Sequence, residues 1–451
     1  MKKTLLMVSL SLALVGCATD PKEIVSPQLP EAFSAPMPQN VAEVMNPQWW
    51  KDFNDPELDR LVDMALSNAT NLKVAMLNVE KADAVLMQTG AKLLPTLSSN
   101  GKAERSGVDF HKHDTSNFRV GASAAWELDF WGKNYSSRLA ALESREASNF
   151  AAQSVRLSLV GSVCQTYFDW LSTNDSLKSL AENLANREKA LRIVENKYRA
   201  GVATPVDVEN AKSALATIQA DLASMKLAKE KIITSMQTLV GDMTLTMKEG
   251  SLMAVPAAVK PGIPSEVLLM RPDVRQAESN LRAKGALIHV ARAAFFPSIS
   301  LTADTVTVGS ALNQLFSAST WGAGIMIDLP IFTAGSRIAK YNEAKVDEQI
   351  ALEQYRQTAF NAYKDVQDAL NEIHYLKDVT NALRIAKDSA DKAENRARTR
   401  YEAGVASFLE LLDAQRSANT AGIAYNNARE NELNAVVHLM KALGVVENPE
   451  G

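Results

Sequence analysis

The sequence has little of what several protein classes require. It has two cysteines, Cys17 and Cys164, so it can form at most one intrachain disulfide. Aromatic residues make up 6% of its 451 residues, and its 48 basic side chains do not outnumber its 52 acidic ones. Without a basic surplus to neutralise phosphates, we expect no binding to nucleic acid. Apart from a short N-terminal stretch, no apolar run approaches the roughly 20 residues of a membrane-spanning helix, so crossing a membrane would need another device.

Signatures of enzymes are also missing. Of the five histidines, only His111 and His113 lie close together, in a segment that we expect to be a surface loop. Such a pair favours exposure to solvent over metal binding. The chain has no P-loop, dinucleotide fingerprint, nucleophile elbow or HExxH motif. We therefore expect no catalysis, no cofactor and no metal site, which leaves transport and purely structural roles to compare.

The N-terminus has the features of a secretory signal. Two lysines precede a short apolar run that ends in small residues. Residues 14–17 (LVGC) resemble the lipobox of bacterial lipoproteins, in which the cysteine is lipidated and becomes the first residue of the mature chain. The resemblance implies a signal peptide at 1–16 and a covalent lipid at Cys17. Because Ala18 follows instead of an aspartate, it also implies an outer-membrane address.

The segment after the signal differs in composition from the rest of the chain. Residues 17–54 contain six of the sixteen prolines, so we expect an extended, acylated tether with no helix. If Cys17 carries lipid, Cys164 is the only thiol left. Its apolar and aromatic neighbours predict that it is a buried small side chain.

Beyond the tether, the chain repeats itself at an offset of about 202 residues. The matching pairs are 197–203 (KYRAGVA) with 400–406 (RYEAGVA), and 93–98 (LLPTLS) with 295–300 (FFPSIS). This period is far longer than the 20–50 residues of a solenoid repeat. We interpret the chain as two copies of one large unit, at about 55–260 and 261–451.

Each copy is expected to contain the same elements in the same order. A first helix (about 56–93 and 265–294) is followed by two strands, a very long helix, a glycine-containing break and a last long helix. The long segments 133–200 and 336–403 contain no proline. Their apolar residues recur at steps of three and four, which predicts helices with coiled-coil-like packing. About 68 residues at 1.5 Å each make a helix of roughly 100 Å.

Four segments alternate between apolar and polar residues with a period of two, which predicts β-strands. They lie at about 95–106, 117–131, 297–308 and 321–332. Each is long enough to cross a bilayer at a tilt. A soluble amphipathic sheet would show the same alternation, so the strands alone leave both interpretations open.

The number of strands constrains any membrane structure. Four strands cannot close a barrel, for which about eight is the practical minimum. Open sheet edges in lipid would leave backbone groups unpaired at several kcal/mol each. If the strands span a membrane, several chains must therefore share one barrel. Two chains would fill the interior with side chains, whereas three or more would leave a pore.

The motifs resemble those of one family, the TolC-like outer-membrane factors, and within it the lipoprotein branch of multidrug efflux channels. The matching segments are 49–58 (WWKDFNDPEL), 268–275 (LLMRPDVR), 296–298 (FPS) and the paired Tyr-x-Ala-Gly-Val-Ala segments. They cover almost the whole mature chain. The resemblance implies a mainly α-helical homotrimer with a membrane β portion. Its shared 12-stranded β-barrel would stand atop a 12-helix periplasmic α-barrel.

The same resemblance implies partners and a function. The trimer would sit in outer-membrane lipid, bind a periplasmic adaptor protein and receive substrates from an inner-membrane efflux pump. It would passively conduct drugs or other small toxic compounds to the outside. A type I protein secretion channel and a metal-efflux duct share this architecture and stay open as alternatives. The fifteen methionines are not clustered as a copper pathway would favour.

The family also implies a periplasmic gate just past the paired turns. The matching residues are Asp207 after the first turn, Tyr401 before the second, and Glu410 and Asp413 after it. Glu410 and Asp413 are three apart and share a helix face. Some members have an arginine after the second turn that ties the gate shut, but this chain has Ala406 there. The alternative is that these acidic side chains have no gating role and only stabilise the N-terminal ends of their helices through the helix dipole.

The turns themselves resemble the tips that dock the adaptor. Their residues are Gly201, Val202, Ala203, Gly404, Val405 and Ala406. Ordinary capping of a helix C-terminus explains the glycines. It explains the small apolar residues that follow them less well. In the strands, residue parity places seven charged side chains on one face, which would be the lumen of a pore. They are Lys102, Glu104, Arg119, Glu127, Asp129, Asp304 and Asp328, or −3 per chain. We therefore expect mild cation selectivity.

Overall fold

The computed structural model describes residues 30, 33, 47–108, 112–256 and 265–445. The expected signal peptide, Cys17 and most of the tether lie outside these residues, as does His111. The chain divides into two compact units. The first is built mainly from Met76–Phe150 and Arg275–Thr358, and the second mainly from 47–75, Ala151–Val274 and 359–445. Each unit combines segments of both sequence copies.

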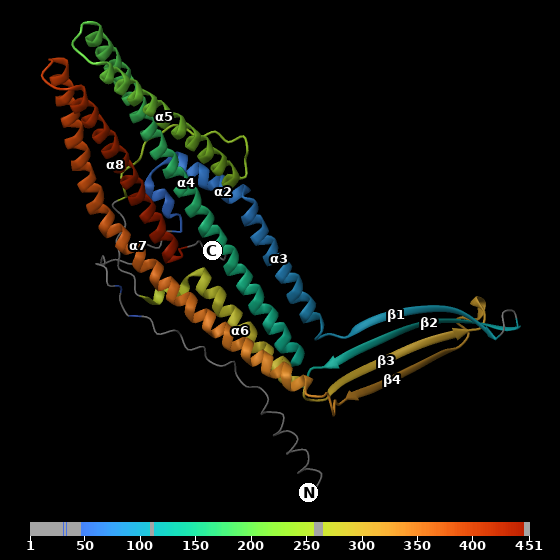
Figure 1. Ribbon diagram of the computed structural model, residues 1–451. Helices are drawn as coiled ribbons and strands as arrows, with labels where there is room; N and C mark the ends of the chain where they lie inside the picture. The colour runs from blue at the N-terminus through green and yellow to red at the C-terminus, as the bar shows by residue number, and fades with distance from the viewer. Residues whose placement is uncertain (1–29, 31–32, 34–46, 109–111, 257–264, 446–451) are drawn as a thin grey trace. The chain divides into compact units, whose positions relative to one another are not determined.

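The first unit contains one antiparallel sheet of four strands in the order β1-β2-β3-β4 (Figure 1). The strands are β1 (Thr96–Val108), β2 (Lys112–Leu128), β3 (Ser298–Gly309) and β4 (Ser319–Asp328). All four expected strands are present. The expected bounds are off by up to five residues, since β2 begins at Lys112 and β4 ends at Asp328. β1 and β4 are the edges of the sheet.

The strand register decides which side chains share a face. Lys102 lies opposite Arg119, and Ser123 lies opposite Asp304. Directly opposite residues point to the same side of a sheet. The register therefore confirms one shared face for six of the seven charged residues, which are Lys102, Glu104, Arg119, Glu127, Asp304 and Asp328.

The expectation for Asp129 is wrong. It lies past the end of β2, and its carboxylate accepts hydrogen bonds from the backbone N–H groups of Asn134 (3.0 Å) and Tyr135 (2.7 Å). These N–H groups belong to the first turn of the next helix, where they have no partner within the helix. Asp129 therefore stabilises a helix start and is not part of the charged face.

Aromatic residues join the two copies where strands meet helices. The Trp131 ring stacks on Phe296 with centroids 4.8 Å apart, and its Nε1 donates to the Pro297 carbonyl at 2.7 Å. Phe295 contacts Tyr341 edge to face. The stacking of Trp131 on Phe296 thus connects copy one to copy two at the ends of the strands.

Seven α-helices are present in the described part of the chain. They are α2 (Pro56–Asn68), α3 (Thr70–Ala91), α4 (Lys133–Arg199), α5 (Pro205–Val240), α6 (Pro272–Ala293), α7 (Ser336–Glu402) and α8 (Phe408–Leu443). The very long helices are confirmed, because α4 and α7 each have 67 residues, and α5 and α8 each have 36. No helix among the described residues is long and apolar enough to span a membrane.

The single first helix expected in each copy is wrong. In copy one, Ala69 has ψ 126° and separates α2 from α3. In copy two, a short 3₁₀-helix (Ser265–Met270) precedes α6. No proline or glycine lies next to Ala69, but the polar cluster at 67–71 (SNATN) is a local signal for this break.

The expected tether is also too long. Trp49–Phe53 forms a 3₁₀-helix, and Trp49, Trp50 and Phe53 are buried in the second unit. Phe53 packs on Phe168 of α4, with ring centroids 5.0 Å apart. Hydrophobic burial overrides the extended bias of the nearby prolines. Cys164 is fully buried as expected, and burial raises the pKa of its thiol.

Candidate gate at the hairpin tips

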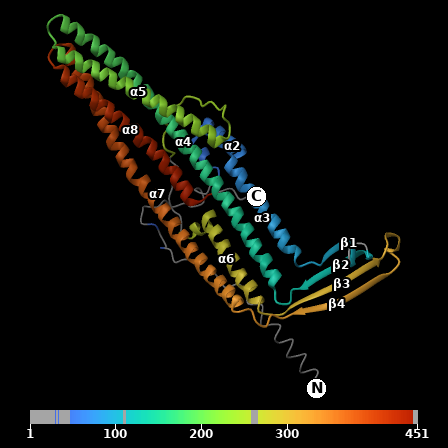
Figure 2. The ribbon, with the colours of Figure 1, turned by 45° about the vertical axis from the view of Figure 1, so that its right-hand side comes forward.

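The second unit contains two helical hairpins, α4–α5 and α7–α8, whose turns lie side by side (Figure 2). The turns have the same backbone. Gly201 and Gly404 have φ of 75° and 77°, a left-handed conformation that favours glycine. The N–H of Val202 donates to the Lys197 carbonyl, and that of Val405 donates to Arg400.

The expected docking residues occupy the ends of these hairpins. Val202 and Val405 are exposed at 75% and 66%, whereas Ala203 and Ala406 are half-buried. One step into the hairpins, all four helices contribute to one apolar cluster, which we call the tip cluster. Its buried members are Ala190, Val194, Val208, Ala211, Ala214, Ala397, Tyr401, Phe408, Leu411 and Leu412. The tip cluster holds the two hairpins of one chain together.

Asp207 begins α5 as part of a capping box. Its carboxylate accepts from the Thr204 backbone N–H at 2.9 Å and from the Thr204 hydroxyl at 2.8 Å. In return, the Asp207 N–H donates to the Thr204 hydroxyl at 3.2 Å. Two N–H groups at the helix start are thereby paired.

Tyr401 is the expected gate residue that lies inside the protein. Its side chain is only 4% exposed, and its ring packs on Phe408 with centroids 5.7 Å apart. Burial, and then the nearby charge of Asp207, raise the pKa of the Tyr401 phenol. The phenol therefore stays neutral, and Asp207 lies close enough to act on it electrostatically.

Glu410 and Asp413 lie on the exposed face of α8. Glu410 forms an ion pair with Arg400 at 2.9 Å, which connects the end of α7 to the first turn of α8. Asp413 is 4.0 Å from Arg416 on its own helix, with both side chains mostly exposed. The structure thus places two of the expected acids on one exposed surface, separate from the buried Tyr401.

Three polar residues at this site were not found from the sequence. They are Lys197 and Arg187 of α4 and Gln415 of α8. Lys197 donates to the backbone at the end of α7, and Arg187 donates to Gln415. One signal was available, because Arg187 interrupts the apolar stripe of α4. No local pattern indicates that its partner lies more than 200 residues later.

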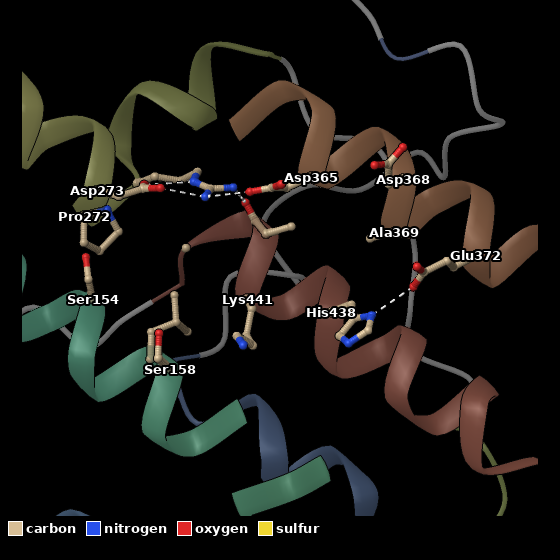
Figure 3. Close-up of a pocket in the computed structure, with 14 residues that line it drawn as sticks. Ser154, Ser158, Pro272, Asp273, Asp365, Asp368, Ala369, Glu372, His438 and Lys441 are labelled. Atoms are coloured by element: carbon tan, nitrogen blue, oxygen red, sulfur yellow. Dashed lines mark hydrogen bonds and ion pairs between the residues drawn. The ribbon is translucent and has the colours of Figure 1, made fainter. Parts of the chain in front are cut away.

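A second cluster of charges lines a cavity of about 430 Å³ in the same unit (Figure 3). Arg271 forms a bidentate ion pair with Asp273, contacts Asp365 of α7 at 3.2 Å, and donates to the Ala442 carbonyl of α8 at 2.6 Å. At the other end, His438 lies 2.9 Å from Glu372. The arginine therefore connects three helix segments. No group of three potential metal ligands occurs in the described chain.

Comparison with known proteins identifies the family. The model of the family described as "Outer membrane efflux protein" matches residues 61–242 and 263–445. The chain belongs to the outer membrane efflux protein family. The two matches correspond to the two sequence copies, so the chain is a tandem repeat of this domain.

Relatives and solved structures of the family match over most of their length. The pyoverdine export outer membrane protein OpmQ of Pseudomonas aeruginosa is 32% identical, covering 88% of this chain and 87% of OpmQ. The cation efflux system protein CusC of Escherichia coli is 33% identical, covering 92% of each. The crystal structure of the Campylobacter jejuni CmeC outer membrane channel matches with a TM-score of 0.85 and 26% identity, over 96% of this chain and 93% of CmeC.

These matches determine the class of protein. The chain has the fold of outer-membrane efflux channels and is the outer-membrane exit component of an efflux system. The family consists of channel proteins and not of enzymes.

Proposed function

We propose that three copies of this chain form one exit duct, which carries small toxic compounds from an inner-membrane pump and a periplasmic adaptor to the outside. The observation that supports this most is the four-stranded sheet with two open edges, β1 and β4. Because unpaired edges are costly in lipid, β4 of one copy would pair with β1 of the next. Three copies supply twelve strands, enough to enclose a pore.

The adaptor would bind the hairpin tips. Exposed Val202 and Val405 give each chain two similar apolar ends, and the identical backbone turns make them near-equivalent docking sites. Exposed apolar side chains on paired tips favour a protein partner.

Cys17 would carry a covalent lipid that holds the N-terminus in the outer membrane. The lipobox-like sequence LVGC at 14–17 supports this. The mass of the mature protein would then exceed that of residues 17–451 by acyl chains, and Cys17→Ala would remove the excess. An unmodified mature mass would refute the anchor.

The gate would be formed by the tip acids around the three-fold axis. Glu410 and Asp413 of each copy lie on an exposed helix face near the tip, and Asp207 lies at the same level of the other hairpin. Carboxylates brought together by symmetry repel one another and attract cations. Cations bound in the aperture would therefore block conductance through the duct.

The pump, and not this chain, would select the substrate. OpmQ and CusC are named for pyoverdine and for cations, yet their identities to this chain are nearly equal, at 32% and 33%. The sequence identity of a relative to this chain therefore does not depend on the substrate for which that relative is named. This supports a passive duct whose substrate range depends on the pump.

A susceptibility panel on a deletion strain tests the proposal. We expect hypersensitivity to dyes, detergents, bile salts and antibiotics, restored by the wild-type chain but not by a variant lacking β3 and β4. Sensitivity to metal ions alone would indicate a metal-efflux duct. Normal survival together with loss of a secreted protein would support the type I secretion alternative instead.

A further inference from the structure

The two hairpin tips are copies in sequence and backbone, but their cations have different partners. At an offset of 203 residues, Lys197 corresponds to Arg400, Tyr198 to Tyr401, and Asp207 to Glu410. In both copies the cation belongs to the last turn of the long helix, and the acid to the first turn of the next helix. Identical turns would allow the same ion pair in both.

Only copy two forms that ion pair. Arg400 bonds to Glu410 at 2.9 Å, within its own hairpin. In copy one, the Asp207 carboxylate accepts two hydrogen bonds from Thr204 and is held in the capping box. Among the described residues, Lys197 forms no salt bridge with Asp207, so its ammonium group can bond elsewhere.

Lys197 reaches the other hairpin. Its Nζ donates to the backbone carbonyl of Tyr401 at 2.6 Å and lies 3.9 Å from the centroid of the Tyr401 ring. The first contact is a charge-assisted hydrogen bond and the second is a cation–π interaction. Both are stronger where water is excluded, and Tyr401 is 4% exposed while its counterpart Tyr198 is 47% exposed.

The family resemblance implies a lock that ties the gate shut, and the contact of Lys197 with Tyr401 joins the two hairpins as such a lock would. A gate made of hairpin tips can open only if one hairpin moves relative to the other. Ala406 cannot supply a bond between them, whereas Lys197 joins the end of α4 to the end of α7. Arg400 does not, because its ion pair stays within one hairpin.

We propose that Lys197 is the residue that latches the two hairpins of each copy in the closed gate, through the carbonyl and ring of Tyr401. The proposal rests on the proposed exit duct and its gate. Lys197 acts as a positioning residue, since it holds Tyr401 and α7 in place and does not itself line the aperture. Opening breaks this contact while the Arg400–Glu410 pair persists.

Ion conductance of the full-length protein in planar lipid bilayers tests the latch, with potassium chloride as the probe. Lys197→Met keeps the length and apolar contact of the side chain but removes its charge and donor. We expect the ratio of open to closed channels to rise about tenfold. Lys197→Arg should stay close to wild type, because a guanidinium can also stack on a ring and donate.

Two further variants separate the latch from a general effect of charge or folding. Lys212→Met removes an exposed cation that pairs with Glu209 on its own helix, and it should leave gating unchanged. Combined with Tyr401→Leu, Lys197→Met should add little further opening, because both changes remove the same contact. If the Lys197→Met variant does not assemble, the open-to-closed ratio of Lys197→Gln is compared with that of Lys197→Arg instead.

The outcomes distinguish the latch from the duct. If the wild type conducts and the Lys197→Met and Lys197→Gln channels open as rarely as it does, the latch is wrong and the duct stands. Equal opening in Lys197→Met and Lys212→Met would also overturn the latch. If the wild-type protein forms no channel, the duct itself is wrong, and the latch with it.

Discussion

Arg187 of α4 donates from Nη1 to Oε1 of Gln415 on α8 at 2.6 Å, in a buried contact between the two hairpins. One helical turn away, Asn183 donates to Asn419 at 2.9 Å. The pairs step by four residues on each helix in opposite directions, as antiparallel neighbours require. This polar ladder fixes how α4 and α8 align.

Removing the arginine from the ladder should destabilise the protein. Arg187→Leu leaves buried Gln415 without its partner and removes one of the positive charges near Glu394, which keeps its ion pair with Arg398. We expect the free energy of unfolding to fall by about 2–4 kcal/mol. Chemical denaturation followed by far-ultraviolet circular dichroism measures this. The exposed pair of Lys364 and Asp368 provides the control, since Lys364→Met should cause no measurable change. An Arg187→Leu variant as stable as this control would contradict a structural role for the ladder.

Stability should also depend on pH through a second contact of α4 with α8. Burial, a hydrogen bond with Glu430 and the charge of that residue raise the pKa of Asp169 to about 7. An unfolded aspartate titrates near about 4, so between these values the folded state binds more protons than the unfolded state. Stability should therefore fall as pH rises from about 4 to about 7.

Replacing the carboxyl tests this directly. Asp169→Asn should remove this decline, so the difference in melting temperature between the variant and the wild type should grow as pH rises to about 7. Thermal unfolding at several pH values measures it. A difference that does not change with pH would show that Asp169 titrates normally.

The two exposed gate acids should contribute unequally to cation block. The carboxylate of Glu410 is already paired with Arg400 at 2.9 Å, whereas Asp413 is 4.0 Å from its nearest cation, Arg416. We expect Asp413→Ala to raise the half-blocking concentration of magnesium more than Glu410→Ala does. Titration of the bilayer conductance with magnesium chloride measures both. If the double variant conducts and is blocked as the wild type, the acids do not form the gate.

The charged face of the sheet should make the pore mildly selective for cations. With Asp129 removed from it, this face carries two positive and four negative side chains, or −2 per chain. Glu104 and Glu127 form ion pairs with Lys102 and Lys133, so Asp304 and Asp328 should carry most of the effect. Asp304→Asn with Asp328→Asn should abolish the preference. The reversal potential in a gradient of dilute potassium chloride measures it, and an anion-selective wild type would contradict the assignment.

The periodic elements could be predicted from the sequence because their signals are local. Alternation located all four strands, and long runs without proline located α4 and α7. The exceptions depend on partners far along the chain. Trp49–Phe53 is helical because its side chains are buried within the second unit. Asp129 leaves the charged face because it caps α4.

The partners of the tip residues were even harder to predict from the sequence. The repeat located both turns, and the family resemblance selected Asp207, Tyr401, Glu410 and Asp413. Neither could distinguish Lys197 from Arg400, which occupy equivalent positions in near-identical turns. Their different partners follow from whether the acid of the same hairpin is held by a capping box, which only the folded backbone determines.

The native mass of the purified protein in detergent tests the central claim most directly. The described part of the chain has four strands and two open sheet edges, which can enclose a pore only together with other copies. The account predicts a mass three times that of one chain, after correction for bound detergent. A monomer would contradict the duct and favour a periplasmic coiled-coil scaffold.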